Sequence, residues 1–264
     1  MKKIKIISTD FDGTLLTSDK KITNRTRECL LNLKNKSYIL IGITARNLLS
    51  VKNALDVCIF DYIILNNGSD VYYVKEDKIE NISSIENETV EKIYNLFNDK
   101  TCQIDFCTPY KYLIKTKEKN DNRTVVEYID GLNDIKDSVS RMNIFFENPK
   151  DLEKNRSLIE KEFENINVVK MVDTDKDNSR MWLTLNPKNV NKLITLKKIC
   201  NDLNYTIEEV VFFGDGENDL VLIENVGISV AMGNAIDIVK EKASFVTLSN
   251  DNDGVAEYLE NNLE

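Results

Sequence analysis

Two carboxylates stand two residues apart near the start of the chain, where an apolar run gives way to a polar loop. Asp10 and Asp12 follow the β-branched run Ile4–Thr9, and Gly13 and Thr14 come next, where a sharp turn is expected. One such carboxylate can attack phosphorus, while its neighbour, kept partly protonated by nearby negative charge, can protonate a leaving oxygen. An acidic turn after a strand would contain the same residues. From this segment alone, both interpretations stay open.

A second acidic loop lies far along the chain, after another apolar run. Gly214-Asp215-Gly216-Glu217-Asn218-Asp219 follows Glu209–Phe213 and begins a helix. Oxygens of Asp10 and Asp215, with a loop carbonyl and water, would form an octahedral magnesium site that Asp219 supports. A turn before an acidic helix is the simpler alternative, and a dinucleotide-binding fingerprint fails because Asp219 occupies its third glycine position. We favour the magnesium site over the simple turn.

The composition excludes several kinds of chemistry. None of the 264 residues is histidine, which excludes serine and cysteine triads, histidine phosphatases and most zinc hydrolases. Cys102 and Cys107 would supply only half of a zinc site, and no second cysteine pair completes it. Any catalysis must therefore depend on carboxylates, hydroxyls, lysines and metal ions.

The charge balance restricts the partners. Lys and Arg total 35 against 44 Asp and Glu, and the formal charge of −9 would repel nucleic acid and anionic membranes. No apolar run is long enough for a signal peptide or a membrane span, and the scattered cysteines fit a reducing compartment, so we expect a cytoplasmic protein. The oligomeric state leaves no mark on the sequence. An anionic substrate must be held by a few local cations or a metal.

Strands and helices alternate at both ends of the chain, and each expected strand ends in polar residues. This pattern predicts an α/β fold with a doubly wound parallel, Rossmann-like sheet, in which ligands bind outside the carboxyl ends of the strands. The expected strands are Ile4–Thr9, Tyr38–Ile43, Tyr62–Leu65, Glu209–Phe213, Gly227–Val230 and Phe245–Thr247. The expected helices cover 24–36, 47–55 and 191–203, with others through Leu222 and near Ile236.

The middle of the chain has a different pattern of expected elements, with short strands rich in aromatic residues and two helices. We expect a catalytic core formed by residues 1–82 and 186–264, and an inserted α+β cap domain formed by 83–185. Inside it, Asp173–Asp177 has the alternating acids of a calcium loop, but Asn178 replaces the turn glycine and Thr184 the bidentate glutamate. A hairpin turn is the better interpretation.

Four segments resemble, in order, the four motifs of the haloacid dehalogenase superfamily, and together with their surroundings they cover about half of the chain. The segments are Asp10-Phe11-Asp12-Gly13-Thr14, Thr44, Lys192 and Gly214–Asp219. The first two are 34 residues apart (44 − 10), whereas the second and third are 148 apart (192 − 44). An insertion after the second motif resembles the Cof-like branch, whose α/β cap is implied to choose the substrate and whose members include many sugar phosphatases.

The resemblance implies a role for each motif residue. Asp10 would be the nucleophile and Asp12 the general acid and then base, with Mg²⁺ held by Asp10, Asp215 and the carbonyl of Asp12. Thr44 and Lys192 would bind the transferring phosphoryl group. Asn218 and Asp219 would support the nucleophile and the metal, and Asn218 would also help to bind the phosphate.

Two residues depart from the family pattern. Ala45 stands where glycine is frequent, but its N–H near a helix start still suits phosphate, and Arg46 either reaches the substrate or pairs with an acidic neighbour. Leu193 follows Lys192 where a small residue is frequent. Rival lysines are Lys188, Lys197 and Lys198, but position relative to the last motif favours Lys192. Asn67 and Gly68 either line the mouth of the site or form a turn.

The function expected is magnesium-dependent hydrolysis of small phosphorylated metabolites, with sugar phosphates favoured, through an aspartyl-phosphate on Asp10. A phosphomutase or phosphotransferase would use the same intermediate with a sugar acceptor. A signalling receiver domain is near half this length and lacks an acid two residues after the nucleophile. A non-catalytic protein that holds a phosphorylated ligand is the third alternative, although the intact set of acids argues against it.

Overall fold

The structure is a computed structural model of the chain, and it describes residues 3–98, 103–116, 126–173 and 180–263. The chain divides into two compact units, which we call the core unit and the inserted unit. The core unit is Met1–Ala45, Val51–Glu80 and Asn191–Glu264, and the inserted unit is Arg46–Ser50 and Asn81–Val190. The inserted unit therefore extends a few residues beyond the expected limits of 83 and 185. Among the described residues, no helix has the length and apolar character that crossing a membrane requires.

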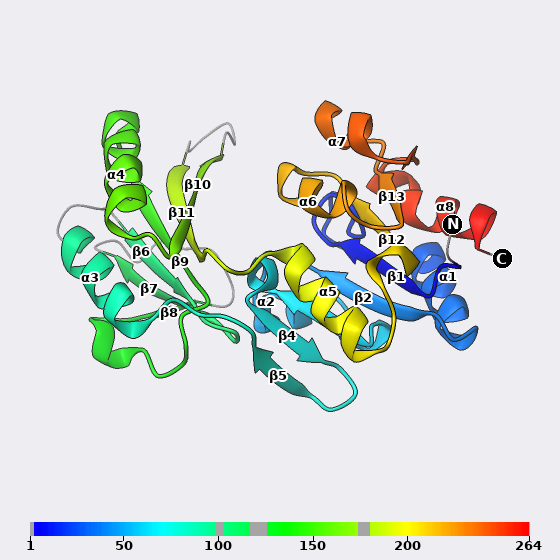
Figure 1. Cartoon of the computed structure of the whole chain (residues 1–264), viewed down its shortest axis with the longest axis horizontal. Helices are drawn as coiled ribbons and strands as arrows, with labels where there is room; N and C mark the ends of the chain where they lie inside the picture. Colours follow the sequence, from blue (N-terminus) through cyan, green and yellow to red (C-terminus); the bar gives the residue numbers. More distant parts are fainter. Residues whose placement is uncertain (1–2, 99–102, 117–125, 174–179, 264) are drawn as a thin grey trace. The chain divides into compact units, whose positions relative to one another are not determined.

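The core unit is built on a sheet that has eight strands among the described residues, in the order β14-β13-β12-β1-β2-β3-β4-β5 (Figure 1). The strands are β1 (Ile6–Asp10), β2 (Ile39–Ile43), β3 (Tyr62–Leu65), β4 (Asp70–Tyr73), β5 (Lys78–Asn81), β12 (Val210–Gly214), β13 (Ile228–Ala231) and β14 (Phe245–Val246). β1 runs parallel to both of its neighbours, β12 and β2. The predicted α/β class and parallel sheet are confirmed.

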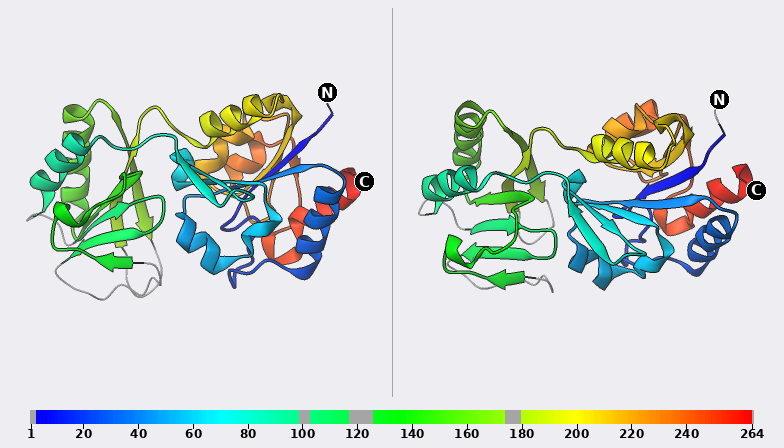
Figure 2. Two further views of the ribbon diagram at one scale, coloured as in Figure 1. Left: turned by 90° about the horizontal axis from the view of Figure 1, so that it is seen from below. Right: turned by 60° about the horizontal axis from the view of Figure 1, so that its bottom comes forward.

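Helices cover both faces of this sheet. α1 (Asn24–Asn35) and α8 (Gly254–Asn262) pack together on one face. α5 (Lys192–Asp202), α6 (Leu220–Ile223) and α7 (Asp237–Lys242) lie on the other (Figure 2). A further helix, α2 (Leu48–Ala54), follows β2. With both faces covered, β1 and β12 are buried along their whole length, which explains why β12 has no polar side chain.

The sequence analysis did not predict the end of the sheet beyond β3. There the chain turns back, and β4 pairs antiparallel with β3. β5 follows at the edge of the sheet and is half-buried or exposed. Its sequence, Lys78–Asn81, has only one apolar residue, so it lacks the continuous apolar run that identified the buried strands.

The inserted unit has a sheet of six described strands in the order β10-β11-β9-β6-β7-β8. They are β6 (Gln103–Cys107), β7 (Tyr112–Thr116), β8 (Val126–Tyr128), β9 (Arg141–Phe146), β10 (Ile166–Asp173) and β11 (Arg180–Pro187). Both helices, α3 (Asn87–Phe97) and α4 (Pro149–Glu162), pack into the apolar core on one face (Figure 2). β10 and β11 pair antiparallel, and most of the hairpin turn expected between them, 174–179, lies outside the described residues.

A glycine in the middle of β2 makes room for the residue that follows Asp10. A Cβ on Gly42 would lie 2.4 Å and 2.6 Å from two ring carbons of Phe11. Phe11 is fully buried and packs on Phe60 with ring centroids 5.4 Å apart. Because an aromatic ring in a close-packed core has no free space to move into, Gly42 fixes the position of the chain just after Asp10.

We predict that Gly42→Ala lowers the free energy of unfolding by about 1–3 kcal/mol, because the new methyl group overpacks the core against Phe11. Gly131→Ala is the control, since its Cβ would meet nothing closer than the Tyr94 hydroxyl at 3.9 Å. We expect the control to stay within about 0.5 kcal/mol of the native chain. Urea unfolding followed by circular dichroism measures both, and equal stability of the two variants would contradict the packing argument.

Candidate active site

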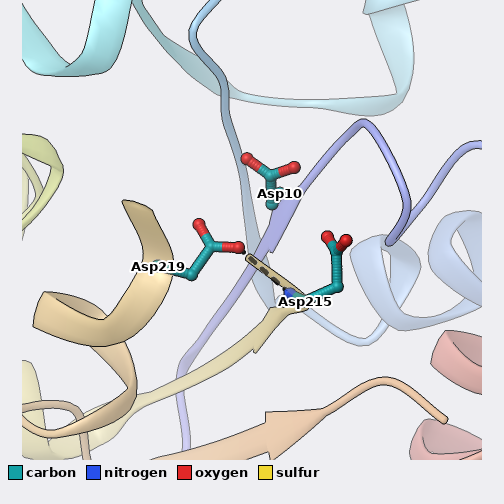
Figure 3. Close-up of side chains that lie close together, drawn as sticks. All are labelled: Asp10, Asp215 and Asp219. Carbon is teal, nitrogen blue, oxygen red and sulfur yellow. Dashed lines mark hydrogen bonds between the residues drawn. The ribbon is translucent and has the colours of Figure 1, made fainter. Parts of the chain in front are cut away.

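Three carboxylates and one ammonium group converge at one edge of the core sheet. Asp10 ends β1, Asp215 and Asp219 lie in the loop after β12, and Lys192 is the first residue of α5. Asp10, Asp215 and Asp219 each offer a carboxylate oxygen, and these oxygens lie within 4.8 Å of one another (Figure 3). Residues more than 200 positions apart are thus brought into one cluster.

Strand register causes this convergence. Thr9 pairs with Phe213 across β1 and β12, so the two acidic loops leave the sheet side by side. Asp10 pairs with Ile43 on the opposite neighbour, β2, so that Thr44 begins one residue beyond. The order of the strands places β1 between β12 and β2, the arrangement at which parallel α/β sheets bind ligands.

Lys192 is the cation of the cluster. Its Nζ donates to Oδ1 of Asp10 and to Oδ1 of Asp219, each at 2.7 Å, and the side chain is 2% exposed. Lys198, one of its rivals in the sequence, instead pairs with Glu80 and Asp202 at the surface. Of the two, Lys192 is the one that contacts the acidic cluster.

The turn at Asn66–Gly68 fixes the start of α5. The Thr195 hydroxyl donates to the carbonyl of Gly68 at 2.7 Å. Gly68 has φ +110°, and a Cβ there would lie 2.5 Å from the carbonyl oxygen of Asn191, so only glycine fits. The side chain of Asn191 caps the helix by accepting from the N–H of Ile194. The sequence left this segment open between two interpretations, and the structure shows a turn that supports the Lys192 helix.

The side chain of Asp219 holds the conformation of the loop after β12 through hydrogen bonds. Its Oδ2 accepts from the N–H groups of Asp215 at 3.0 Å and Gly216 at 3.2 Å, while its Oδ1 binds Lys192. The side chain is 1% exposed. One carboxylate therefore connects the backbone of the loop to the lysine.

Gly13 and Thr14 join the first acidic loop to the second. The Thr14 hydroxyl donates to Oδ1 of Asp215 at 2.7 Å. A Cβ on Gly13, which has φ +78°, would lie 2.3 Å from Oδ2 of Asp215. The sequence analysis assigned both residues to the turn alone and missed their contact with Asp215. No local pattern reveals a contact between residues 201 positions apart.

The remaining candidates lie in the segments that follow β1, β2 and β12. Asp12 is half-buried and accepts from Nζ of Lys20 at 3.0 Å. Thr44 is 1% exposed, and its backbone bonds to Ile64 and Asn67. Ala45 and Arg46 are half-buried at the boundary where the chain passes into the inserted unit, and Asn218 is exposed in the turn before α6.

Burial is the largest influence on the pKa values of the charged groups in the cluster. It raises the pKa of Asp10, against the opposing effect of the Lys192 ammonium, and it raises the pKa of Asp215, against the hydrogen bond from Thr14. Burial alone would lower the pKa of Lys192, but the carboxylates of Asp10 and Asp219 outweigh it and the pKa rises.

With all four groups ionised, one positive charge faces three negative ones. The excess favours a divalent cation, and carboxylate oxygens are the donors that Mg²⁺ prefers. The residues present therefore fit the metal expected from the sequence.

The model of the haloacid dehalogenase-like hydrolase family matches residues 7–259. The chain belongs to this family. The resemblance inferred from the four motifs is thus confirmed, and the family match spans both units rather than the motif segments alone.

Several curated relatives from Bacillus subtilis (strain 168) are named as phosphatases. One, called 5-amino-6-(5-phospho-D-ribitylamino)uracil phosphatase YcsE, is 29% identical over 257 residues, covering 97% of this chain and 94% of that protein. A second of the same activity name, YitU, is 28% identical over 272 residues, covering 96% of each. A haloacid dehalogenase-like hydrolase from Bacteroides thetaiotaomicron has a similar crystal structure, with a TM-score of 0.84, 28% identity and coverage of 98% and 99%. This haloacid dehalogenase-like chain is a phosphatase.

We predict that Lys192→Met lowers the free energy of unfolding by about 3–5 kcal/mol without added metal, because it leaves Asp10 and Asp219 buried without a cation. Lys198→Met removes an equally long lysine from an exposed pair and should cost no more than about 1 kcal/mol. Urea midpoints at neutral pH with EDTA compare the two variants. If the two variants have the same urea midpoint of unfolding, the buried ion pairs of Lys192 do not stabilise the core unit.

Proposed function

We propose that the chain is a magnesium-dependent phosphomonoesterase that hydrolyses small phosphorylated metabolites, sugar phosphates in particular, through an aspartyl-phosphate on Asp10. The observation that supports this most is the Asp10 carboxylate, buried at a strand end and held by Lys192 within reach of two further carboxylates. Such a side chain has few rotamers left, so it is preorganised for attack on one point in space.

The residues of the chain would divide the reaction between them. Asp10 attacks phosphorus in line, and Asp12 protonates the oxygen of the leaving alcohol and then takes a proton from the attacking water. Thr44 and Lys192 bind the phosphoryl oxygens, assisted by the N–H of Ala45 and by Arg46. Asn218 positions the phosphoryl group from the loop after β12.

Asp10, Asp215 and the carbonyl of Asp12 would hold Mg²⁺, and Asp219 would orient them. The ion supplies positive charge that offsets the repulsion between a carboxylate and an anionic phosphate ester. Asp219 accepts one hydrogen bond from the backbone N–H of Asp215 and one from that of Gly216, which supports its role as the residue that orients a ligand.

The substrate class is supported by the names of the relatives. The two similar phosphatases of Bacillus subtilis are named for a phosphorylated ribityl compound, a sugar-alcohol phosphate. We therefore include 5-amino-6-(5-phospho-D-ribitylamino)uracil among the candidate substrates, beside glucose 6-phosphate, nucleotides and pyridoxal phosphate. The inserted unit would recognise the part of the substrate that carries no phosphate.

We expect the native chain to release phosphate from this panel with Mg²⁺ and not with EDTA. Asp10→Asn should lower the rate roughly 10⁴-fold or more, because the amide is no nucleophile. Asp137→Asn changes an exposed aspartate in the same way and should keep the native rate. Rapid acid quenching followed by mass spectrometry should find phosphate bound to the native chain and none on Asp10→Asn.

Three outcomes of this assay would contradict the proposal in different ways. Phosphate release that EDTA does not affect would show that the reaction needs no metal ion. Release that Asp10→Asn does not affect would show that Asp10 is not the nucleophile. Transfer of phosphate to an added sugar, without release when the sugar is absent, would identify a phosphotransferase.

We predict that Asp219→Asn raises the Mg²⁺ concentration needed for half-maximal activity about 10–100-fold, since its Oδ2 positions the backbone of the Asp215 loop. Glu217→Gln, an equal loss of charge in the same loop, is exposed and should leave that concentration unchanged. Rates measured across a Mg²⁺ titration decide the matter. Equal shifts in both variants would mean that the loop's overall charge, and not the hydrogen bonds of Asp219, controls metal affinity.

A further inference from the structure

The loop that carries Asp12 turns back on itself before α1 begins, and we call residues 12–21 the Asp12 loop. A bridge pairs Asp12 with Leu16, and the N–H of Leu16 donates to the carbonyl of Phe11 at 2.8 Å. Gly13 has φ +78° and no side chain, so its backbone has more conformations open to it than that of its neighbours. The position of Asp12 therefore depends on contacts that hold the loop from outside.

Asn234 holds this loop through a carboxamide that uses both of its ends. Its Nδ2 donates to the carbonyl of Gly13 at 2.7 Å, and its Oδ1 accepts from the N–H of Asn250 at 3.0 Å. A carbonyl only accepts and a backbone N–H only donates, so the two partners fix which end of the carboxamide faces each of them. Asn234 is exposed, yet both ends of its side chain bind the backbone of other segments.

The turn that carries Asn234 is itself attached to the second acidic loop. On one side of Asn234 the N–H of Met232 donates to the carbonyl of Gly214 at 3.1 Å. On the other side the N–H of Ile236 donates to the carbonyl of Asp215, also at 3.1 Å. The backbone of the turn is thus bound to the loop after β12, while its side chain reaches the loop after β1. Asn234 therefore connects the two loops whose carboxylates form the site.

Two residues of a turn near the C-terminus bind the Asp12 loop further along. Nδ2 of Asn250, which is 8% exposed, donates to the carbonyl of Leu16 at 2.9 Å. The carboxylate of Asp251 accepts from the N–H and from the hydroxyl of Ser18, each at 2.7 Å. Of these attachments and that of Asn234, the bond from Asn234 lies nearest to Asp12 in the sequence.

We propose that Asn234 is a positioning residue, whose carboxamide holds the Gly13 carbonyl and so places Asp12 for proton transfer. The inference rests on the proposed function. There, Asp12 gives its carboxyl proton to the leaving oxygen as the bond from phosphorus to that oxygen breaks and the bond from Asp10 to phosphorus forms. Proton transfer needs donor and acceptor at hydrogen-bond distance, so a small displacement of the loop lowers its rate.

Leaving groups differ in their need for this proton. An alkyl phosphate such as glucose 6-phosphate releases a strongly basic alkoxide, which must be protonated as it departs. p-Nitrophenyl phosphate releases a stable phenolate, which departs without a proton. A displaced Asp12 therefore slows the first ester and spares the second, whereas a smaller fraction of folded protein lowers both rates by the same factor.

Two substitutions remove the donor in different ways. Asn234→Asp keeps the shape and the acceptor but sets a carboxylate oxygen against the Gly13 carbonyl, and Asn234→Leu removes the donor without adding charge. For both variants we expect kcat/KM to fall about 10–100-fold with the best alkyl phosphate of the panel, and less than about 3-fold with p-nitrophenyl phosphate. The comparison uses kcat/KM because this quantity extends only to the departure of the leaving group and excludes the later hydrolysis of the aspartyl-phosphate.

Asn252→Asp is the control, since it adds the same charge within the turn that contains Asn250. Asn252 is exposed, and its Nδ2 donates to Oγ of Ser249 at 2.7 Å, a hydroxyl that can equally donate to a carboxylate. Both rates of this control should stay within about 2-fold of the native values. Equal losses for the two esters in the Asn234 variants, no loss for either ester, or a loss confined to Asn234→Asp would overturn the inference.

Hydrogen exchange followed by mass spectrometry tests the contact without turnover. In Asn234→Leu the backbone amides of residues 11–18 should exchange about 5- to 10-fold faster than in the native chain, as the loss of one hydrogen bond to the loop implies, and in Asn252→Asp at the native rate. Unchanged exchange in Asn234→Leu would refute the inference.

The two measurements separate this inference from the proposed function. If the native chain hydrolyses neither ester, the proposed function fails, and faster exchange in Asn234→Leu still supports the contact that holds the loop. Native turnover with unchanged selectivity between the two esters in both Asn234 variants would leave the proposed function standing and refute the inference.

Discussion

The ammonium group of Lys192, buried between the carboxylates of Asp10 and Asp219, is the interaction on which the core site depends. Two carboxylates removed from water repel each other and are poorly solvated, so they stay close only when a cation is held between them. That cation is supplied by α5, a helix from a different part of the chain than either strand. The cluster therefore exists only when the sheet and this helix are assembled together.

Two glycines allow the backbone to come close to the residues of the charged cluster. Gly13 lets the first loop pass close to Asp215, and Gly68 lets a turn approach the start of the Lys192 helix. Both glycines have positive φ, so a side chain at either position would meet a collision and backbone strain together. Gly68 thus approaches the backbone at Asn191, whereas Gly13 approaches the carboxylate of Asp215 itself.

Sequence reasoning reached the parts of this arrangement that leave a local pattern. Buried parallel strands appear as runs rich in apolar and β-branched residues, so β1, β2, β3 and β12 could be predicted, and the acidic loops after two of them could be assigned to one site. The contact of Thr14 with Asp215 and the contact of Thr195 with Gly68 could not, because they join residues 201 and 127 positions apart. Such contacts depend on register and helix placement, which composition does not encode.

The buried polar residues of β9 in the inserted unit could not be predicted for another reason. β9 is the sequence RMNIFF, in which Arg141 and Asn143 look like ordinary surface residues between apolar ones. The structure shows that both are buried, with Arg141 opposite Cys107 and Asn143 opposite Asp105 on β6.

The mutual contacts of the cluster also limit how its residues can be replaced. Lys192 binds Asp10 and Asp219, and Asp219 in turn binds the backbone N–H of Asp215. Substituting one of these residues therefore leaves another buried polar group without its partner, which costs more than the loss of an exposed side chain. The buried groups of the cluster are thus constrained as a set, whereas exposed residues of the same loop, such as Glu217, are not.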